Sequence, residues 1–216
     1  MKTVHAAGLA LVLLSGSAMA QGVGVYGVAG TGGLGVGLNL PVGPAFGLRG
    51  ELAQLTTSDT YTEDQITYKG DLKLRGNGVF ADFRPFLGTF RLVAGATFTG
   101  SSAALQAQTT DGTVTIDGQT FSATGNSLLA TIKYPNTMPY LGVGWGHGRF
   151  NEPGWTFGLD LGVSIGKPKV TLTGSGGLMA QPGASAAIAA EERKVQDDLD
   201  SAKVLPVIKV SVGYNF

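Results

Sequence analysis

Charged residues at alternating positions in apolar, glycine-rich segments are the part of this sequence best suited to chemistry. If each segment is a β-strand, these charges share the face opposite to the large apolar side chains. Nine positions fit this description: Arg49, Glu51, Asp71, Lys73, Arg75, Arg91, Lys133, Asp160 and Lys209. The set holds six cations and three anions. We expect these side chains to line one narrow interior.

Such an interior allows two readings. Isolated charges in a low-dielectric interior are costly, so they must pair or stay hydrated. In the first reading they form a salt-bridged, water-filled plug, because a small barrel is only wide enough for side chains to fill it. In the second they line a slow pore whose excess of cations favours anions. Charge reversal at Arg91 should then invert the ion preference.

The sequence predicts no catalytic site, no cofactor and no metal. His147 is the single histidine after residue 20, and the chain has no cysteine. A Ser-His-acid site needs a base that is held by an acid and touches a nucleophile. Strand alternation instead places His147 on the apolar row of Leu141, Val143 and Trp145. A lipid-modifying outer-membrane enzyme stays open as an alternative.

The elements that must position these residues are β-strands. Trp155 to Gly166 alternates large apolar residues with small polar ones, and residues 204–216 do the same. This period of two recurs along the chain and indicates an all-β protein. Strands are expected over residues 22–30, 33–41, 46–56, 67–83, 89–106, 119–134, 138–149, 155–166, 168–174 and 204–216. Because several could merge, we expect a transmembrane antiparallel up-and-down β-barrel of eight strands, with ten as the alternative.

The polar faces favour a membrane barrel over a soluble one. They carry mainly Gly, Ser and Thr, and only 14% of all residues are charged, which is too few for a water-facing sheet. Aromatic residues near strand ends fit interfacial girdles: Tyr134, Tyr140, Trp155, Tyr214 and Phe216. A soluble periplasmic binding barrel is the alternative architecture.

Segments outside the strands complete the expected organisation. Residues 1–20 read as a cleaved signal peptide, with Lys2, an apolar stretch and a final Ala18-Met19-Ala20. Residues 21–216 then form the barrel, with an amphipathic helix over about 184–203 inserted before the last strand. Residues 41–44, 84–88 and 135–138 read as tight periplasmic reversals. Polar residues 56–67 and 101–126 read as extracellular loops, the second with a projecting hairpin.

Two inner motifs carry a family resemblance. Asp82-Phe83-Arg84-Pro85-Phe86 with Phe90-Arg91-Leu92, then Pro139 to Gly146, resemble small proteobacterial barrels of the ornithine-uptake, carbapenem-resistance-associated porin type, over about residues 70–216. The resemblance implies an eight-stranded barrel that passes small basic amino acids. The terminal Tyr214-Asn215-Phe216 resembles the signal by which outer-membrane assembly machinery recognises its substrates, carried by Tyr214 and Phe216.

The predicted function is that of a monomeric outer-membrane barrel with a structural or passive-transport role. Its expected partners are outer-membrane lipid and lipopolysaccharide, the assembly machinery and small solutes. Nucleic acid is not expected, because 15 basic residues against 15 acidic ones leave no basic excess.

Overall fold

The computed structural model describes residues 22–63, 66–109, 112–122, 124, 126–148, 150 and 152–216. The predicted signal peptide, residues 1–20, lies outside the described residues. The strands are β1 (Gly24–Gly30), β2 (Gly33–Pro41), β3 (Phe46–Glu63), β4 (Ile66–Arg75), β5 (Asn77–Phe83), β6 (Phe90–Phe98), β7 (Ser102–Thr109), β8 (Thr113–Ile116), β9 (Gln119–Ser122), β10 (Ser127–Lys133), β11 (Thr137–Gly146), β12 (Gly154–Ile165), β13 (Lys169–Ser175) and β14 (Val204–Asn215). A 3₁₀ turn η1 (Gly176–Ala180) and a helix α1 (Ala184–Leu199) lie between β13 and β14.

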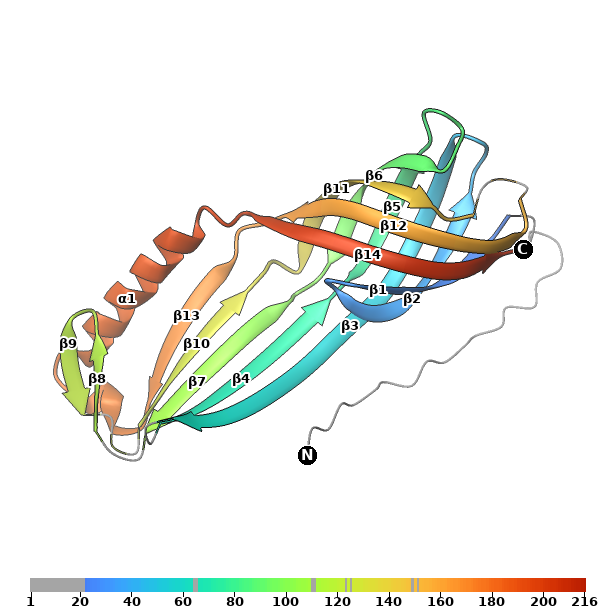
Figure 1. Cartoon of the computed structure of the whole chain (residues 1–216). Helices are drawn as coiled ribbons and strands as arrows, with labels where there is room; N and C mark the ends of the chain where they lie inside the picture. The colour runs from blue at the N-terminus through green and yellow to red at the C-terminus, as the bar shows by residue number, and fades with distance from the viewer. Residues whose placement is uncertain are drawn as a thin grey trace.

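Eight of these strands close into an antiparallel barrel. Their order is β3-β2-β1-β14-β12-β11-β6-β5, and β5 pairs back onto β3 to complete the ring (Figure 1). β1 and β14 join the two ends of the barrel sequence, with Gly24 opposite Asn215. The predicted eight-stranded barrel is therefore confirmed, and the ten-stranded alternative is wrong.

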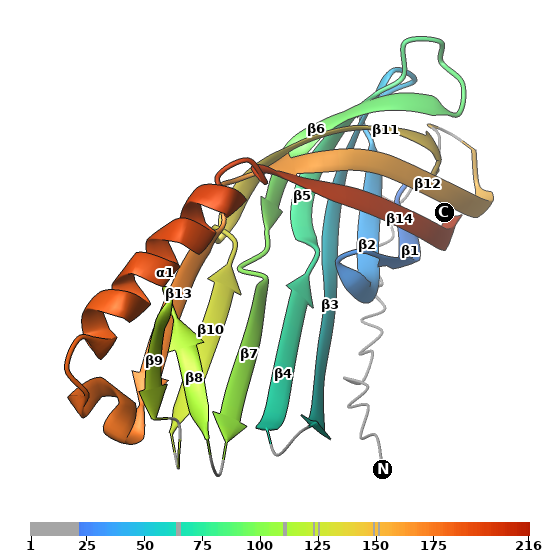
Figure 2. The ribbon, with the colours of Figure 1, turned by 60° about the vertical axis from the view of Figure 1, so that its left-hand side comes forward.

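The sheet continues past one end of the barrel, which we call the mouth. There β4, β7, β10 and β13 extend it from residues 54–63 of β3; we call these four strands and this half of β3 the extension. β4 continues into β5 through Gly76. In the same way β6 continues into β7, β10 into β11 and β12 into β13, so that each of these strands of the barrel has a successor or predecessor in the extension (Figure 2). The barrel's own strands and the extension are thus one bent sheet.

Three sequence expectations about turns and loops need correction. Residues 135–138 were expected to reverse the chain, but they lie where β10 passes into β11 without a change of direction. Residues 56–67 were expected to be a loop, but most of them belong to the β3–β4 hairpin. Residues 101–126 were also expected to be a loop, but residues 102–109 form β7. The hairpin expected within this segment is confirmed as β8–β9, where Asp117 and Gly118 both have positive φ, as a type I′ hairpin turn requires.

The faces of the sheet exchange character at the mouth. On the barrel's outer wall large apolar side chains are exposed, among them Trp155 and Phe157 of β12 and Val212 of β14. On the extension the apolar residues Leu55, Leu72, Leu74 and Leu105 instead continue the inner wall, and the outer wall carries polar residues. A strand wall that meets lipid needs apolar side chains, whereas the same wall in water needs polar ones. The mouth therefore marks the edge of the lipid-facing surface.

The lipid-facing band has the height of a membrane core. The ten residue steps from Trp155 to Ile165 of β12 span about 25 Å along the barrel axis, at about 3.3 Å per residue and a tilt of about 40°. Aromatic contacts ring the end opposite the mouth, including Trp155–Tyr214 and Phe90–Trp145. Trp155, Tyr214 and Phe216 therefore sit in an aromatic girdle, as expected from their positions in the sequence.

The helix predicted over 184–203 is confirmed, and its regular part ends at Leu199. The helix lies beside the β8–β9 hairpin and β13 (Figure 2). Its residues Ala187 and Ile188 pack on Ile116 and Phe121 of the hairpin, over the inner face of β10 and β13. The helix also caps the free edge of β13: Glu192 Oε2 accepts from the backbone N–H of Leu172 at 2.8 Å, and Gln196 Oε1 accepts from that of Val170 at 3.0 Å. No helix in the described part of the chain is long and apolar enough to cross a membrane.

The change of face at the mouth predicts that an arginine introduced on the outer wall costs much more stability in the barrel than in the extension. Leu161→Arg places a charge near the middle of the lipid-facing band, so we expect the free energy of unfolding to fall by about 2–4 kcal/mol. Thr171→Arg, on the outer wall of β13, should change it by no more than about 0.5 kcal/mol. Equilibrium unfolding from lipid vesicles measures both values. Equal costs for the two variants would contradict the placement of the lipid edge.

Candidate functional site

Arg49 is the centre of a charge cluster inside the barrel. β3 directs it inward, where Nε and Nη2 donate to the two carboxylate oxygens of Asp82 at 2.7 and 3.1 Å. The same guanidinium donates to Glu51 at 2.9 Å and to Asp160 at 3.1 Å. One cation thus joins three carboxylates from three different strands.

Arg91 makes the second set of contacts. Its Nη2 donates to Asp160 Oδ1 at 2.8 Å, its Nη1 donates to the carbonyl of Gly146 at 2.6 Å, and its Nε lies 3.5 Å from Asp82. The pair lies flat on Gly144, where an added Cβ would stand 2.7 Å from Arg91 and 2.8 Å from Asp160. A side chain at position 144 would therefore displace the ion pair.

Lys209 makes the third set, on the side of the cluster nearest the mouth. Its Nζ donates to Glu51 Oε2 at 2.6 Å and lies 4.1 Å from the centre of the Phe80 ring. Tyr26 donates its hydroxyl proton to the other oxygen of Glu51 at 2.9 Å. Phe80 packs edge-on against Tyr140, so two aromatic rings border this end of the cluster.

The charges of the cluster balance. It holds the cations Arg49, Arg91 and Lys209 and the anions Glu51, Asp82 and Asp160, each with a side chain no more than 7% exposed. Burial of this kind is tolerated only when every charge is paired and hydrogen-bonded. Within this cluster the expected excess of cations is absent, because Asp82 adds an anion and four of the nine predicted residues lie elsewhere. Arg84 is a further fully buried cation, nearer the opposite end of the barrel, where its Nη2 donates to the carbonyl of Gly148 at 3.1 Å.

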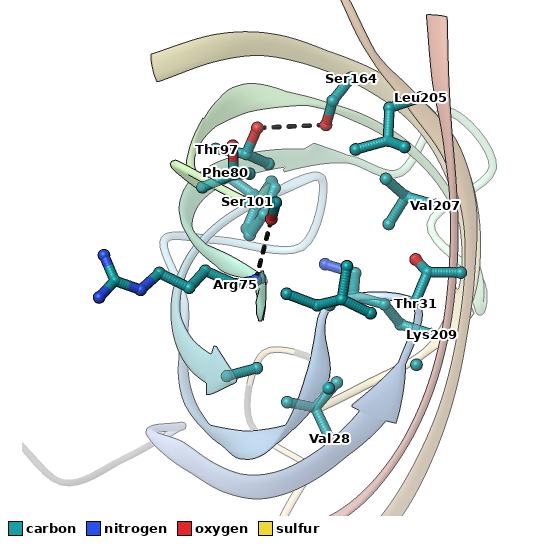
Figure 3. Close-up of a pocket in the computed structure, with 17 residues that line it drawn as sticks. Val28, Thr31, Arg75, Phe80, Thr97, Ser101, Ser164, Leu205, Val207 and Lys209 are labelled. Carbon is teal, nitrogen blue, oxygen red and sulfur yellow. Dashed lines mark hydrogen bonds between the residues drawn. The ribbon is translucent and has the colours of Figure 1, made fainter. Parts of the chain in front are cut away.

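Those four residues lie on the extension. Asp71, Lys73 and Arg75 on β4 and Lys133 on β10 belong to its outer wall, and Asp71 and Lys133 are exposed. Figure 3 shows Arg75 pointing away from the other residues around the mouth. The assignment assumed that apolar residues face lipid along every strand, and above the mouth this relation is reversed.

Asp82 was not predicted as an inward-facing charge, although the alternation of residues along β5 could be read from the sequence. It shares the inward face of β5 with Phe80 and Gly78, opposite Val79, Ala81 and Phe83. The aromatic residue on that face hid its polar character. The expected place of Tyr140 in an aromatic girdle is also wrong, because this aromatic residue belongs to the inward face. It is 1% exposed and lies inside the barrel against Phe80.

His147 also lies inside the barrel, not on the lipid-facing row. Gly146 and His147 have φ angles of +81° and +63°, so the alternation of β11 ends there and the ring turns inward. Ser211 Oγ lies 3.3 Å and Asp160 Oδ2 lies 3.5 Å from the same ring atom, Nε2. A Ser-His-acid site needs the two partners on different ring nitrogens. These contacts do not make one.

A pocket of about 60 Å³ opens between the mouth and the cluster. Its walls combine apolar residues such as Val28 and Val207 with hydroxyl groups, and Thr97 and Ser164 are hydrogen-bonded to each other at 3.1 Å (Figure 3). Phe80 and Lys209 form its inner end. The Lys209–Glu51 pair is therefore the part of the cluster that lies nearest the pocket.

The cluster predicts a large effect for one arginine and a small effect for another. Arg49→Ala leaves three buried carboxylates with only two cations, so the free energy of unfolding should fall by about 3–5 kcal/mol. Arg75→Ala, on the outer wall of the extension, should cost no more than about 0.5 kcal/mol. Urea unfolding of both variants in detergent measures the difference, and a similar loss in both would contradict the central role of Arg49.

Comparisons with known proteins agree with this architecture. No protein-family model matches the chain, and no curated protein matches it. The fold is similar to the crystal structure of Acinetobacter baumannii CarO, with a TM-score of 0.58 and 25% identity over 89% of this chain and 97% of that one. It is equally similar to A. baumannii CarO2, with a TM-score of 0.59 and 26% identity over 90% and 98% of the two chains. The predicted resemblance is confirmed: the chain is similar to the CarO barrels, and this similarity together with the closed eight-stranded barrel supports a porin-like outer-membrane β-barrel protein.

Proposed function

We propose that the protein passes small solutes at a low rate, with the charge cluster as the constriction of the barrel. The observation that carries this proposal is the pocket, which leads from the mouth to Lys209 and stops at paired charges. Ion pairs can exchange partners without leaving a charge unpaired, because Glu51, Asp82 and Asp160 each have more than one cation or donor within reach. A solute could therefore replace one partner at a time.

The mouth faces outward from the cell in this proposal. The opposite end of the barrel carries the chain end and short connections, such as the one between β2 and β3, as periplasmic ends of such barrels do. The extension, with its polar outer wall, then stands in water outside the lipid. Export through a signal peptide at residues 1–20 and insertion guided by Tyr214 and Phe216 belong to the same proposal.

The solute class follows from the charge balance. Three cations and three anions give the constriction no net preference for anions, so the preference expected from a cation-rich lining is not part of this proposal. Lys209 at the end of the pocket does not favour a basic solute either. Neutral and zwitterionic solutes fit best, because they can meet both signs of charge.

Removal of the outermost ion pair should widen the path. Lys209→Ala combined with Glu51→Ala keeps the remaining cluster balanced, so we expect liposomes with this variant to swell several-fold faster in a small neutral or zwitterionic solute than those with the unchanged protein. Arg75→Ala, at the rim of the same pocket but pointing away from it, is the matched control. If the double variant folds, as its heat-modifiable gel migration would show, and still passes nothing, the barrel is a sealed structural protein.

A change of charge without a change of width tests the constriction separately. Arg91→Glu leaves two cations beside four anions in the cluster, so the reversal potential in a planar bilayer should shift toward cation selectivity. Arg75→Glu should leave the reversal potential where it is. An unchanged potential in Arg91→Glu would show that ions do not pass the cluster.

A further inference from the structure

We propose that the outer wall of the extension binds the phosphate groups of lipid A, through a lysine row formed by Lys73, Lys133 and Lys169. These residues come from β4, β10 and β13, and the strand register places them on one line across the sheet. Lys73 is opposite Ser102 of β7, Ser102 is opposite Lys133, and Lys133 is opposite Lys169. Residues directly opposite in register share one face of the sheet, so the three ammonium groups point outward together.

The lysine row lies at the level where lipid ends. Leu74, next to Lys73, lines the pocket at the mouth, and Lys169 begins β13 shortly after the last lipid-facing residue of β12, Ile165. Arg75 lies on the same wall, two residues closer to the barrel, and points outward. The wall therefore changes from apolar to cationic at the height of the lipid headgroups.

The arrangement is unfavourable for the protein alone. Lys133 and Lys169 are both exposed and stand directly opposite one another, and like charges in such a pair destabilise a sheet. Among the described residues none of the three lysines makes an ion pair. The neighbouring Lys167, in contrast, lies 2.6 Å from Asp200 and lowers the pKa of that carboxyl group. An anionic partner would remove the repulsion that the sheet itself leaves uncompensated.

The width of the row favours a ligand with more than one phosphate. From Lys73 to Lys169 the row crosses three strand spacings, which is about 14 Å. A single phospholipid headgroup can occupy only part of that width, whereas the two phosphates at opposite ends of the lipid A disaccharide can meet both ends. This inference uses the outward orientation of the mouth from the proposed function, but it does not depend on solute passage.

The test compares lipid binding by the full chain in detergent. The probe is fluorescent diphosphoryl lipid A, and the variant is Lys73→Gln with Lys133→Gln and Lys169→Gln. We expect its affinity to fall at least tenfold. Arg193→Gln with Lys194→Gln, which removes exposed cations from α1, is the control and should bind as the unchanged protein does. Lys169→Gln alone should also raise the midpoint of thermal unfolding in the absence of lipid A, because it removes the opposed like charge.

Competing ligands separate the sources of phosphate. Monophosphoryl lipid A should bind several-fold more weakly than the diphosphoryl form, and phosphatidylglycerol and inorganic phosphate should compete poorly. Equal binding by phosphatidylglycerol would overturn the assignment to lipid A, and so would an equal loss in the α1 control. Unchanged affinity in the triple variant would overturn the lysine row itself. None of these results depends on whether liposomes swell, so the two proposals fail separately.

Discussion

The medium outside the wall decides which face of each strand is apolar, and the rest of the structure follows from this constraint. Below the mouth the wall meets lipid, so Phe157 and Val212 face outward and the charges face inward. Above the mouth the wall meets water, so Leu72 and Leu74 turn to the inner side and need a cover, part of which α1 and the β8–β9 hairpin supply over β10 and β13. One continuous sheet thus meets both lipid and water. Its side chains keep alternating between the two walls, and only the wall that carries the apolar residues changes.

Much of the fold could be predicted from the sequence, because alternation is a local property. Most strand segments, the barrel class and the helix after residue 184 were readable in this way, whereas residues 119–134, expected as one strand, form β9 and β10. Alternation does not say which medium a face meets, however, and this is why Asp71, Lys73, Arg75 and Lys133 were assigned to the interior. The reversal at Pro135 was predicted from turn-forming residue types, which also occur where one strand bends into the next.

The sequence predicted most members of the charge cluster, but not which of them contact one another. Arg49 and Asp160 are 111 residues apart, and only the closed ring of strands brings them together. His147 could not be placed by counting, because two consecutive left-handed residues interrupt the alternation. The abundance of glycine was the best local signal of the crowded interior. At Gly162, for example, an added Cβ would stand 2.3 Å from the hydroxyl oxygen of Tyr140.

The depth at which the charge cluster is buried separates it from the rest of the protein's electrostatics. At physiological ionic strength, fields between exposed charges decay over about 8 Å, whereas pairs away from solvent are screened much less. Salt that weakens every interaction of the exposed lysines should leave the contacts of Arg49 nearly unchanged. The same chain therefore contains one electrostatic system that responds to the ionic composition of the surrounding solution and another that does not.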